Sequence, residues 1–462
     1  MKPALFLLAL ACQAQSLIIK NVTVIDATGS PERPGLSVSI EAGRITAIKK
    51  KIRAPKNAQI IDGTGKFLIP GLWDMHAHIN APEVYIPLLI ANGITGVREM
   101  YSGVPARAIH EWKPRTGAPI IVAPGFVDGP MMLNNGPPPP GAFAVANAEQ
   151  ARFAVHALAE SGADFLKVYN SIPREAYFAL AEEAGKVGIP FAGHVPEAVT
   201  NAEASDAGQR SMEHLINILL DCSTNAEALR AARIAVMTSA ALSGEARLRA
   251  LAWPDSDDGY SEELAAALFK RFVANHTWQT PTLVLLAGFV HLADEAFLKD
   301  PRRKYLLKQW TDSWEPRASL FLHDLSPAEL EALNGRLVAL LAGEKKLVAD
   351  MHRAGVEFLA GTDASGWTPV FPGSGVHEEM ALLVECGLTS MEALQTATRN
   401  PARYFGKLDA LGTVEVNKEA DLVLLNANPL GDIRNTQKIE AVVLRGRYYS
   451  RQELDALVKV RQ

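Results

Sequence analysis

The sequence has 462 residues, a formal net charge of -5, 48% hydrophobic side chains and 21% charged ones. This composition is typical of a soluble globular protein, and it excludes a disordered chain and a chain with a basic, nucleic-acid-binding character. The length favours one large domain with a smaller one. We therefore expect a small-molecule substrate, no nucleic acid partner and no membrane span, and a homo-oligomer is compatible with the composition.

The N-terminal residues have the order of a secretory signal peptide. Lys2 precedes an apolar run over residues 4–11, and small residues follow around Cys12. Such a run is too short to span a bilayer permanently. We expect residues 1–14 to be a signal peptide and the protein to be exported, periplasmic or secreted. Two alternatives stay open: a lipoprotein anchored through Cys12, although Leu is absent from the third position before it, and a first β-strand.

Short apolar runs alternate with turn residues over residues 16–66, as in "SLIIKNVTVIDATG". This alternation of period two predicts antiparallel β structure. The same texture returns over residues 407–455, as in "LGTVEVNKEADLVLLNANPL". Two β segments that flank one long middle part predict a β-sandwich domain split between the two ends of the chain.

Residues 67–406 alternate β-type runs with helical runs, which is typical of βα units on a parallel sheet. The pattern predicts an α/β fold with a (β/α)₈ barrel. The eight strands are expected near Phe67–Asp74, Ile94–Glu99, Pro119–Ala123, Phe165–Tyr169, Phe191–His194, Ser211–His214, Thr280–Leu286 and Phe358–Gly361.

Two helical insertions, over residues 226–253 and 300–321, are expected beside the active face of this barrel. In the second insertion, Trp310 and Trp314 are four residues apart and therefore share a helix face. They could close over a ligand or simply pack the helix onto the barrel. Cys222 and Cys386 are far apart in sequence, and two free buried thiols are favoured over the disulfide that an exported protein permits.

Metal-compatible side chains stand at the ends of the predicted strands. His76 and His78 are two residues apart, so both can face one point inside a barrel. Four further groups end other strands: Lys167, His194, His214 and Asp363. A barrel places its catalytic groups at the carboxyl ends of its strands, so we expect these six side chains to converge.

The sequence resembles the amidohydrolase superfamily, and most closely its imidazolonepropionase-like and prolidase-like branch of binuclear metal-dependent hydrolases. The resemblance is carried by "DGTGKFLIPGLWDMHAH", "FLKVY" and "EADLVLLNANPLGDI", among other segments, and covers nearly the whole chain. It implies that His76 and His78 ligate one divalent metal ion and that His194 and His214 ligate the other. It also implies that Asp363 lies beside a bridging hydroxide, and that Lys167 is N6-carboxylysine whose two oxygens bridge the metals.

The resemblance further implies a hydrolase that cleaves a C–N bond by attack of the metal-bridging hydroxide, with Asp363 as ligand and catalytic proton carrier. Histidine-rich sites favour Zn²⁺ or a similar borderline metal. Xaa-Pro dipeptides and N-acyl amino acids are the leading substrates. A cyclic amide, a lactone or an ester is the alternative, since a binuclear hydroxide attacks any of these carbonyls.

Two other functions are weaker alternatives. A metal-free scaffold relative is disfavoured because such proteins lose their ligands, and here the full set is present. A mononuclear deaminase is disfavoured because those enzymes do not use a bridging carboxylated lysine, which Lys167 would supply. A lysine that merely reaches toward solvent from a strand end is the alternative for this residue.

Two residues are candidates for contacts with the substrate. Tyr169 lies two residues after Lys167, hence on the same side of the strand, and could donate a hydrogen bond. His377 stands just before a predicted helix, in the region after the eighth strand. Packing at the barrel rim and a surface position at a helix start are the respective alternatives.

Overall fold

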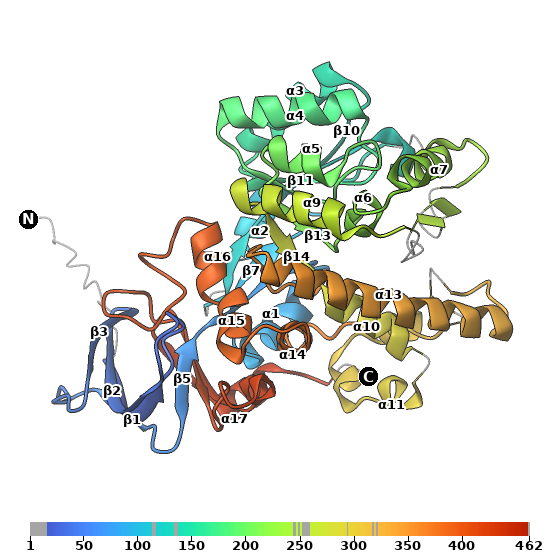
Figure 1. Ribbon diagram of the computed structural model, residues 1–462. Helices are drawn as coiled ribbons and strands as arrows, with labels where there is room; N and C mark the ends of the chain where they lie inside the picture. The colour runs from blue at the N-terminus through green and yellow to red at the C-terminus, as the bar shows by residue number, and fades with distance from the viewer. Residues whose placement is uncertain are drawn as a thin grey trace, which may run out of the picture.

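The structure is a computed structural model that describes residues 16–112, 117–133, 137–243, 246–247, 250–251, 259–292, 294–316, 318–319 and 322–460. The predicted signal peptide, residues 1–14 with Cys12, lies outside the described residues. The fold is mixed α/β, as predicted. Figure 1 shows the strands from the middle of the chain among helices, and the strands of the N-terminal segment at the lower left.

The two ends of the chain share one eight-stranded sheet (Figure 1). Its strand order is β17-β16-β15-β5-β1-β2-β3, and β4 also pairs with β1. The two segments meet where β15 runs antiparallel to β5, with Leu422 opposite Pro70 and Leu425 opposite Phe67. The strands are β1 (Leu17–Val24), β2 (Arg33–Glu41), β3 (Arg44–Lys49), β4 (Gln59–Asp62), β5 (Phe67–Pro70), β15 (Leu422–Leu425), β16 (Ile439–Leu444) and β17 (Arg447–Ser450).

The prediction of an antiparallel arrangement is correct for β1 with β2 and for β2 with β3. It is wrong for β4 and β5, which both pair parallel with β1. Alternation of apolar residues marks a strand with one buried face, but it carries no information on the direction of the neighbouring strand.

The middle of the chain forms two parallel sheets, with strand orders β6-β7-β8 and β10-β9-β11-β12-β13-β14. Isolated parallel bridges join Gln279 to Phe358 and Ala77 to Ala364, so residues 358–364 run between β14 and β6. Parallel pairing brings the carboxyl ends of these strands to one edge. The strands are β6 (Leu72–Ala77), β7 (Ile94–Glu99), β8 (Ile120–Val122), β9 (Pro124–Asp128), β10 (Ala142–Ala144), β11 (Phe165–Val168), β12 (Phe191–Gly193), β13 (Ser211–Glu213) and β14 (Trp278–Thr280).

Helices follow most of these strands and cover the sheets, and α13 is the long helix at the right of Figure 1. None of the helices among the described residues is long and apolar enough to cross a bilayer. The helices are α1 (Pro82–Ala91), α2 (Ala106–His110), α3 (Ala148–Glu160), α4 (Arg174–Val187), α5 (Asn201–Asp206), α6 (Ile218–Asp221), α7 (Ala226–Thr238), α9 (Glu262–Ala274), α10 (Leu283–His291), α11 (Glu295–Leu298), α12 (Lys308–Ser313), α13 (Pro327–Arg353), α14 (Gly375–Glu385), α15 (Ser390–Thr396), α16 (Arg399–Tyr404) and α17 (Arg451–Leu457), with 3-10 turns η1 (Pro130–Leu133), η2 (Pro301–Tyr305) and η3 (Ile433–Gln437).

Three predicted strands need correction. The one predicted over Phe358–Gly361 forms only an isolated bridge, between Phe358 and Gln279. The single strand predicted over Phe67–Asp74 is divided at Gly71, where a Cβ atom would lie 2.2 Å from Thr95 Oγ1, and its two halves join different sheets. The strand predicted over Thr280–Leu286 is wrong after Thr280, because the apolar run that follows forms the buried helix α10. A short apolar run does not by itself distinguish a strand from a buried helix.

The second insertion packs onto the body of the protein. Trp310 and Trp314 are each only 1% exposed. The ring of Trp310 lies 5.4 Å from the ring of Tyr85, and Trp314 Nε1 donates a hydrogen bond to the Gly366 carbonyl at 2.9 Å. The packing alternative is therefore correct for both residues, and closure over a ligand is not. Cys222 and Cys386 are both free and buried.

Candidate metal centre

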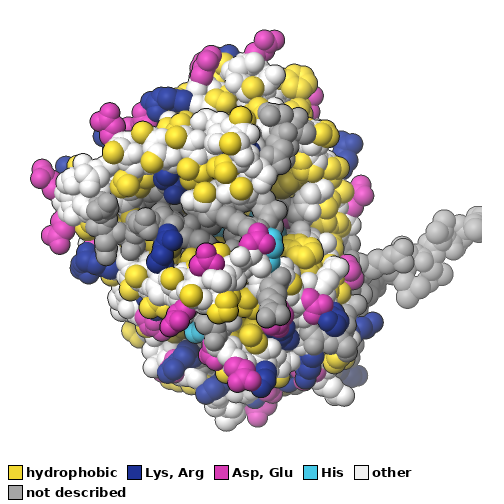
Figure 2. All heavy atoms as spheres, turned by 90° about the vertical axis from the view of Figure 1, so that its right-hand side faces the viewer, with side chains coloured by type: hydrophobic (Ala, Val, Ile, Leu, Met, Phe, Trp, Pro, Cys, Tyr) yellow, Lys and Arg dark blue, Asp and Glu magenta, His cyan; other side chains and the backbone are white. Residues whose placement is uncertain are grey.

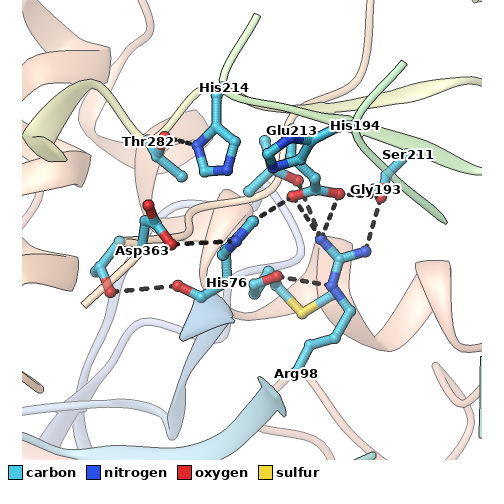
Figure 3. Close-up of polar contacts among 12 residues, drawn as sticks. His76, Arg98, Gly193, His194, Ser211, Glu213, His214, Thr282 and Asp363 are labelled. Carbon is cyan, nitrogen blue, oxygen red and sulfur yellow. Dashed lines mark hydrogen bonds and ion pairs between the residues drawn. The ribbon is translucent and has the colours of Figure 1, made fainter. Parts of the chain in front are cut away.

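The predicted ligands come from separate strands and lie at one edge of the parallel sheets. His76 is in β6 and His78 follows it, Lys167 is in β11, and His194 and His214 directly follow β12 and β13. Asp363 belongs to the segment between β14 and β6. Figure 3 shows His76, His194, His214 and Asp363 directed toward a common centre.

Asp363 and the two histidines of the H-x-H pair form the tightest group. Asp363 Oδ1 lies 3.3 Å from His76 Nε2 and 2.9 Å from His78 Nε2. One ligand atom from each of the three residues lies within 4.8 Å of the others, which is a spacing that could hold a metal ion. His214 and His194 continue the group, since the ring centroids of His76 and His214 are 4.4 Å apart and those of His194 and His214 are 4.8 Å apart.

Lys167 is 1% exposed beside this group, and its Nζ has no hydrogen-bond partner among the described residues. Burial lowers the pKa of Lys167 to about 8, although the charges of Glu213 and Asp363 oppose this shift. A buried amine without a hydrogen-bond partner is costly, and Lys167 Nζ has the Tyr169 ring 5.8 Å away.

Each of the four histidines has its Nδ1 occupied by another part of the protein. The partners and distances are Glu213 Oε2 at 2.8 Å for His76, the Tyr101 carbonyl at 2.5 Å for His78, Asn170 Oδ1 at 2.7 Å for His194 and Thr282 Oγ1 at 2.7 Å for His214. A carboxylate and a carbonyl can only accept, so Nδ1 donates in His76 and His78 and the lone pair of a neutral ring is on Nε2. This is the arrangement that metal-ligating histidines usually show.

The ionisation states suit a cation site. Burial lowers the pKa of His76, and it lowers the pKa of His214 to about 3. Burial alone would raise the pKa of Asp363, but the charge of His214 and hydrogen bonds with His76 and His78 hold it well below its usual range. Burial opposes a charge on His78, but its hydrogen bond with Asp363 and the charge of that carboxylate raise the pKa of His78. Near neutral pH the ionised carboxylate of Asp363 and the neutral imidazoles of His76 and His214 are ligands for zinc and similar metals.

The orientation of His76 depends on residues that the sequence did not indicate. Arg98 Nη2 donates to Glu213 Oε1 at 2.8 Å, and both side chains of this ion pair are fully buried (Figure 3). Arg98 also donates from Nε to the Met75 carbonyl and from Nη1 to Ser211 Oγ, each at 2.7 Å. Burial would raise the pKa of Glu213, but Arg98 and His76 hold it well below its usual range, so the carboxylate stays ionised.

An unusual backbone conformation allows the consecutive residues Glu213 and His214 both to contact the ring of His76. Successive side chains of a strand point to opposite faces, yet Glu213 contacts His76 and His214 packs against the same ring. His214 has φ 60° and Asp363 has φ 55°, a region that non-glycine residues rarely occupy. Such strain concentrates at functional sites, and a sequence pattern does not reveal it.

The two predicted substrate contacts have different outcomes. Tyr169 lies beside the centre, with its ring centroid 4.1 Å from that of His194. His377 is fully buried in α14, where Nδ1 lies 2.9 Å from Thr436 Oγ1 and Nε2 lies 3.1 Å from the Asn92 carbonyl. Because both ring nitrogens are occupied by protein groups, the assignment of His377 to substrate binding is wrong, and the residue has a packing role.

Figure 2 shows one face of the molecule, on which hydrophobic, basic and acidic side chains are intermingled.

Comparisons with known proteins find similarity to amidohydrolases over part of the chain. A model of the amidohydrolase family matches residues 322–448. The chain is 42% identical over 66 residues to an N-acetylglucosamine-6-phosphate deacetylase of Lysinibacillus sphaericus, which is 14% of this chain and 16% of that protein. It is 38% identical over 92 residues to an imidazolonepropionase of Maricaulis maris, which is 20% of this chain and 23% of that protein. The matched segments thus span less than a quarter of the length of either relative.

The fold comparison extends over nearly the whole chain. A crystal structure of a Xaa-Pro dipeptidase with bound methionine superposes with a TM-score of 0.65 at 20% identity, and covers 94% of this chain and 100% of the dipeptidase. At this identity the match shows a shared fold. The family model over residues 322–448 agrees with the resemblance to the amidohydrolase superfamily.

Proposed function

We propose that this protein is a binuclear metal-dependent hydrolase that cleaves C–N bonds, with Xaa-Pro dipeptides and N-acyl amino acids as the leading substrates. The observation that carries the proposal is the set of four histidines whose Nδ1 atoms are all occupied, gathered around Asp363 and Lys167. In this assignment, His76 and His78 hold one metal ion, His194 and His214 hold the other, and Zn²⁺ suits the donor set.

The arrangement of the strands supports this assignment of the metal ligands. We infer a (β/α)₈ barrel over residues 67–406, flanked by a β-sandwich from residues 16–66 and 407–455. The strand pairings β6-β7-β8 and β9-β11-β12-β13-β14, with the two bridges at Phe358 and Ala364, follow the order expected around such a barrel. The candidate ligands then stand at the carboxyl ends of its strands, where barrel enzymes have their active sites.

Lys167 is proposed to carry a carboxylate on Nζ. Because burial lowers its pKa to about 8, a fraction of the amine is neutral near physiological pH and can attack carbon dioxide. An N–C bond forms, one proton leaves, and the product has two carboxylate oxygens in place of an ammonium group. This group would bridge the two metals and would remove the cost of the buried, unpartnered amine.

When bound, the metals would polarise the substrate carbonyl and lower the pKa of a water molecule at the centre. Asp363 is the proposed proton carrier, because its carboxylate is ionised and reaches the centre beside His76 and His78. It takes a proton from the attacking water and returns it to the leaving nitrogen. Glu213 and Asn170 hold the rings of His76 and His194 in position throughout.

The experiment is a hydrolysis screen of protein reconstituted with zinc or manganese in bicarbonate buffer. Xaa-Pro dipeptides, N-acyl amino acids, cyclic amides, lactones and esters are offered, with Asp363→Asn as the matched inactive control. Turnover of amides that is lost in Asp363→Asn is expected. Turnover confined to the cyclic amides, lactones or esters would select the alternative, and no turnover in any class would overturn the proposal.

Export is proposed separately, on the residues at the N-terminus alone. The mature protein is expected to begin after residue 14 and to accumulate outside the cytoplasm. N-terminal sequencing of protein from its native host tests this, since a protein that still begins with Met1 would contradict it. A lipid on Cys12 would indicate a membrane-anchored form instead.

A further inference from the structure

Three aromatic side chains extend from the metal centre along the edge that carries it. The ring of Tyr169 lies 4.1 Å from His194, that of Phe126 lies 5.4 Å from Tyr169, and that of Tyr101 is stacked on Phe126 at 4.4 Å with 17° between the planes. We refer to Tyr101, Phe126 and Tyr169 as the aromatic row.

The aromatic row is built on three strands of the two parallel sheets. Phe126 of β9 pairs in register with Lys167 of β11, so its side chain emerges on the side of the sheet that carries Lys167. Tyr169 follows β11 and Tyr101 follows β7. The row therefore runs along the carboxyl ends of the strands from Tyr169, beside His194, to Tyr101, whose carbonyl contacts His78.

The rings of the aromatic row differ from the core aromatics in their exposure. Tyr101, Phe126 and Tyr169 are all partly exposed, whereas Trp310 and Trp314 are almost completely buried. Burial of aromatic surface is strongly favourable, so rings that served only for packing would gain by being covered. These three residues are therefore partly accessible beside the candidate metal centre.

Tyr101 connects the aromatic row to a candidate ligand. It has φ 89°, a conformation that is costly for a tyrosine. Its backbone nitrogen donates to Glu99 Oε2 at 2.8 Å, and its carbonyl accepts from His78 Nδ1 at 2.5 Å. The same unusual conformation thus orients His78 and places the Tyr101 ring on Phe126. Its hydroxyl donates to the Pro140 carbonyl at 3.1 Å, so this polar group is already used.

We propose that the aromatic row binds a neutral, flat apolar group of the substrate, such as an aryl or other ring substituent next to the scissile carbonyl. The inference rests on the proposed function. Among the substrates proposed there, it favours those with a ring next to the scissile carbonyl. Phe126, in the middle of the row between Tyr101 and Tyr169, carries no polar group. A cationic group could also lie over such a face, but two divalent cations at the adjacent centre would repel it. A neutral ring would be stabilised by stacking on the aromatic row, and, unlike a cation, it has no hydrated charge to desolvate.

Binding is tested with two probes that share a head group. Phenylphosphonate and methylphosphonate are titrated calorimetrically into the zinc-loaded protein. We expect the phenyl compound to bind about tenfold more tightly, within the range of one good aromatic contact. Phe126→Leu should reduce this ratio to about twofold, because the leucine keeps apolar volume but has no ring face.

Two controls isolate the aromatic row. Phe153→Leu removes a ring that is 66% exposed on α3, and it should keep the tenfold ratio. Tyr101→Phe keeps the stacked ring and loses only the hydroxyl, so the ratio should persist there as well. If Phe126→Leu does not fold, Tyr169→Leu replaces it, with the same expected loss.

The outcomes separate this inference from the proposed function. Equal affinities of the two probes in the unchanged protein, or an unchanged ratio in Phe126→Leu, would overturn the aromatic subsite even if amides are hydrolysed. A phenyl preference that Phe126→Leu removes, in a protein that hydrolyses no offered substrate, would support the subsite and count against the hydrolase. When amides are hydrolysed, kcat/KM for N-benzoyl over N-acetyl amino acids should follow the same pattern.

Discussion

Glu213 and Asp363 contact opposite nitrogens of one ring, since Glu213 Oε2 lies 2.8 Å from His76 Nδ1 and Asp363 Oδ1 lies 3.3 Å from His76 Nε2. The buried Arg98 fixes Glu213 in turn. The position of a candidate metal ligand is thus determined by an ion pair that would itself never touch the metal.

The first prediction concerns this contact. Glu213→Gln keeps the size of the side chain but removes the charge that fixes the His76 tautomer. We expect metal affinity to fall about 10–100-fold, as is usual when such a partner is lost. The measurement is competition with a chelator followed by elemental analysis. Glu175→Gln, at an exposed position on α4, is the control, and an unchanged affinity in Glu213→Gln would show that Glu213 does not position the ligand.

The second prediction tests the carboxylated lysine. Lys167→Ala should lose nearly all activity, because the two bridging oxygens and their negative charge are gone. Formate or propionate should restore part of it by entering the space that the side chain vacated. Lys167→Arg should remain inactive with or without these acids, since it keeps the positive charge and cannot form the bridge. A Lys167→Ala protein with normal metal content and near-normal turnover would contradict the bridge.

The third prediction concerns the buried Glu379, which accepts a hydrogen bond from the Val284 backbone nitrogen at 2.8 Å. Burial raises its pKa to about 8 from 4.5, so the folded protein keeps the proton that the unfolded chain releases. The contribution of Glu379 to the free energy of unfolding is therefore largest below pH 4.5. It falls by roughly 1.4 kcal/mol per pH unit as the pH rises toward 8.

Glu379→Gln stays neutral, so its free energy of unfolding should fall less steeply over this window than that of the unchanged protein. Urea unfolding of the metal-free proteins between pH 5 and pH 8 measures the two slopes. Glu331→Gln, exposed on α13, should follow the unchanged protein. Parallel slopes for Glu379→Gln would mean that Glu379 is already ionised in the folded state.

The fourth prediction follows from the packing of the second insertion. Trp314→Phe removes the hydrogen bond to the Gly366 carbonyl and leaves that group without its partner. We expect a loss of about 1–3 kcal/mol in stability with unchanged relative activities among substrates. Thermal unfolding and a substrate panel measure the two effects. Altered preferences at an unchanged melting temperature would restore the idea of a closing element.

The sequence predicted much of the fold because β6, β7, β11, β12 and β13 are short apolar runs that end in polar groups of evident chemistry. The ligand candidates could be found in the same way, since each stands where such a run stops. Glu213 could have been noticed as a carboxylate beside His214. Its partner, however, is 137 residues away, and no local pattern indicates that distance.

Two wrong predictions, the strand after Thr280 and the role of His377, have the same physical cause: the path of the backbone. Thr282 has φ 51° and turns the chain out of β14 into a helix, although its sequence resembles a continuing strand. His377 is near Asp363 in sequence, but its helix directs the ring to Thr436 and Asn92. Contact with the substrate depends on such directions, which residue types alone do not determine.

The pairing of β5 with β15 has a consequence for biosynthesis. Leu422, the partner of Pro70, is synthesised 352 residues later, which corresponds to roughly 20 to 70 s of translation. During that interval the ribosome-bound chain presents the apolar edge of β5 with no strand to cover it, and such an edge invites association with other chains. Premature termination anywhere before residue 422 would leave that edge permanently open, so truncated products of this gene are expected to aggregate or to be degraded rather than to accumulate.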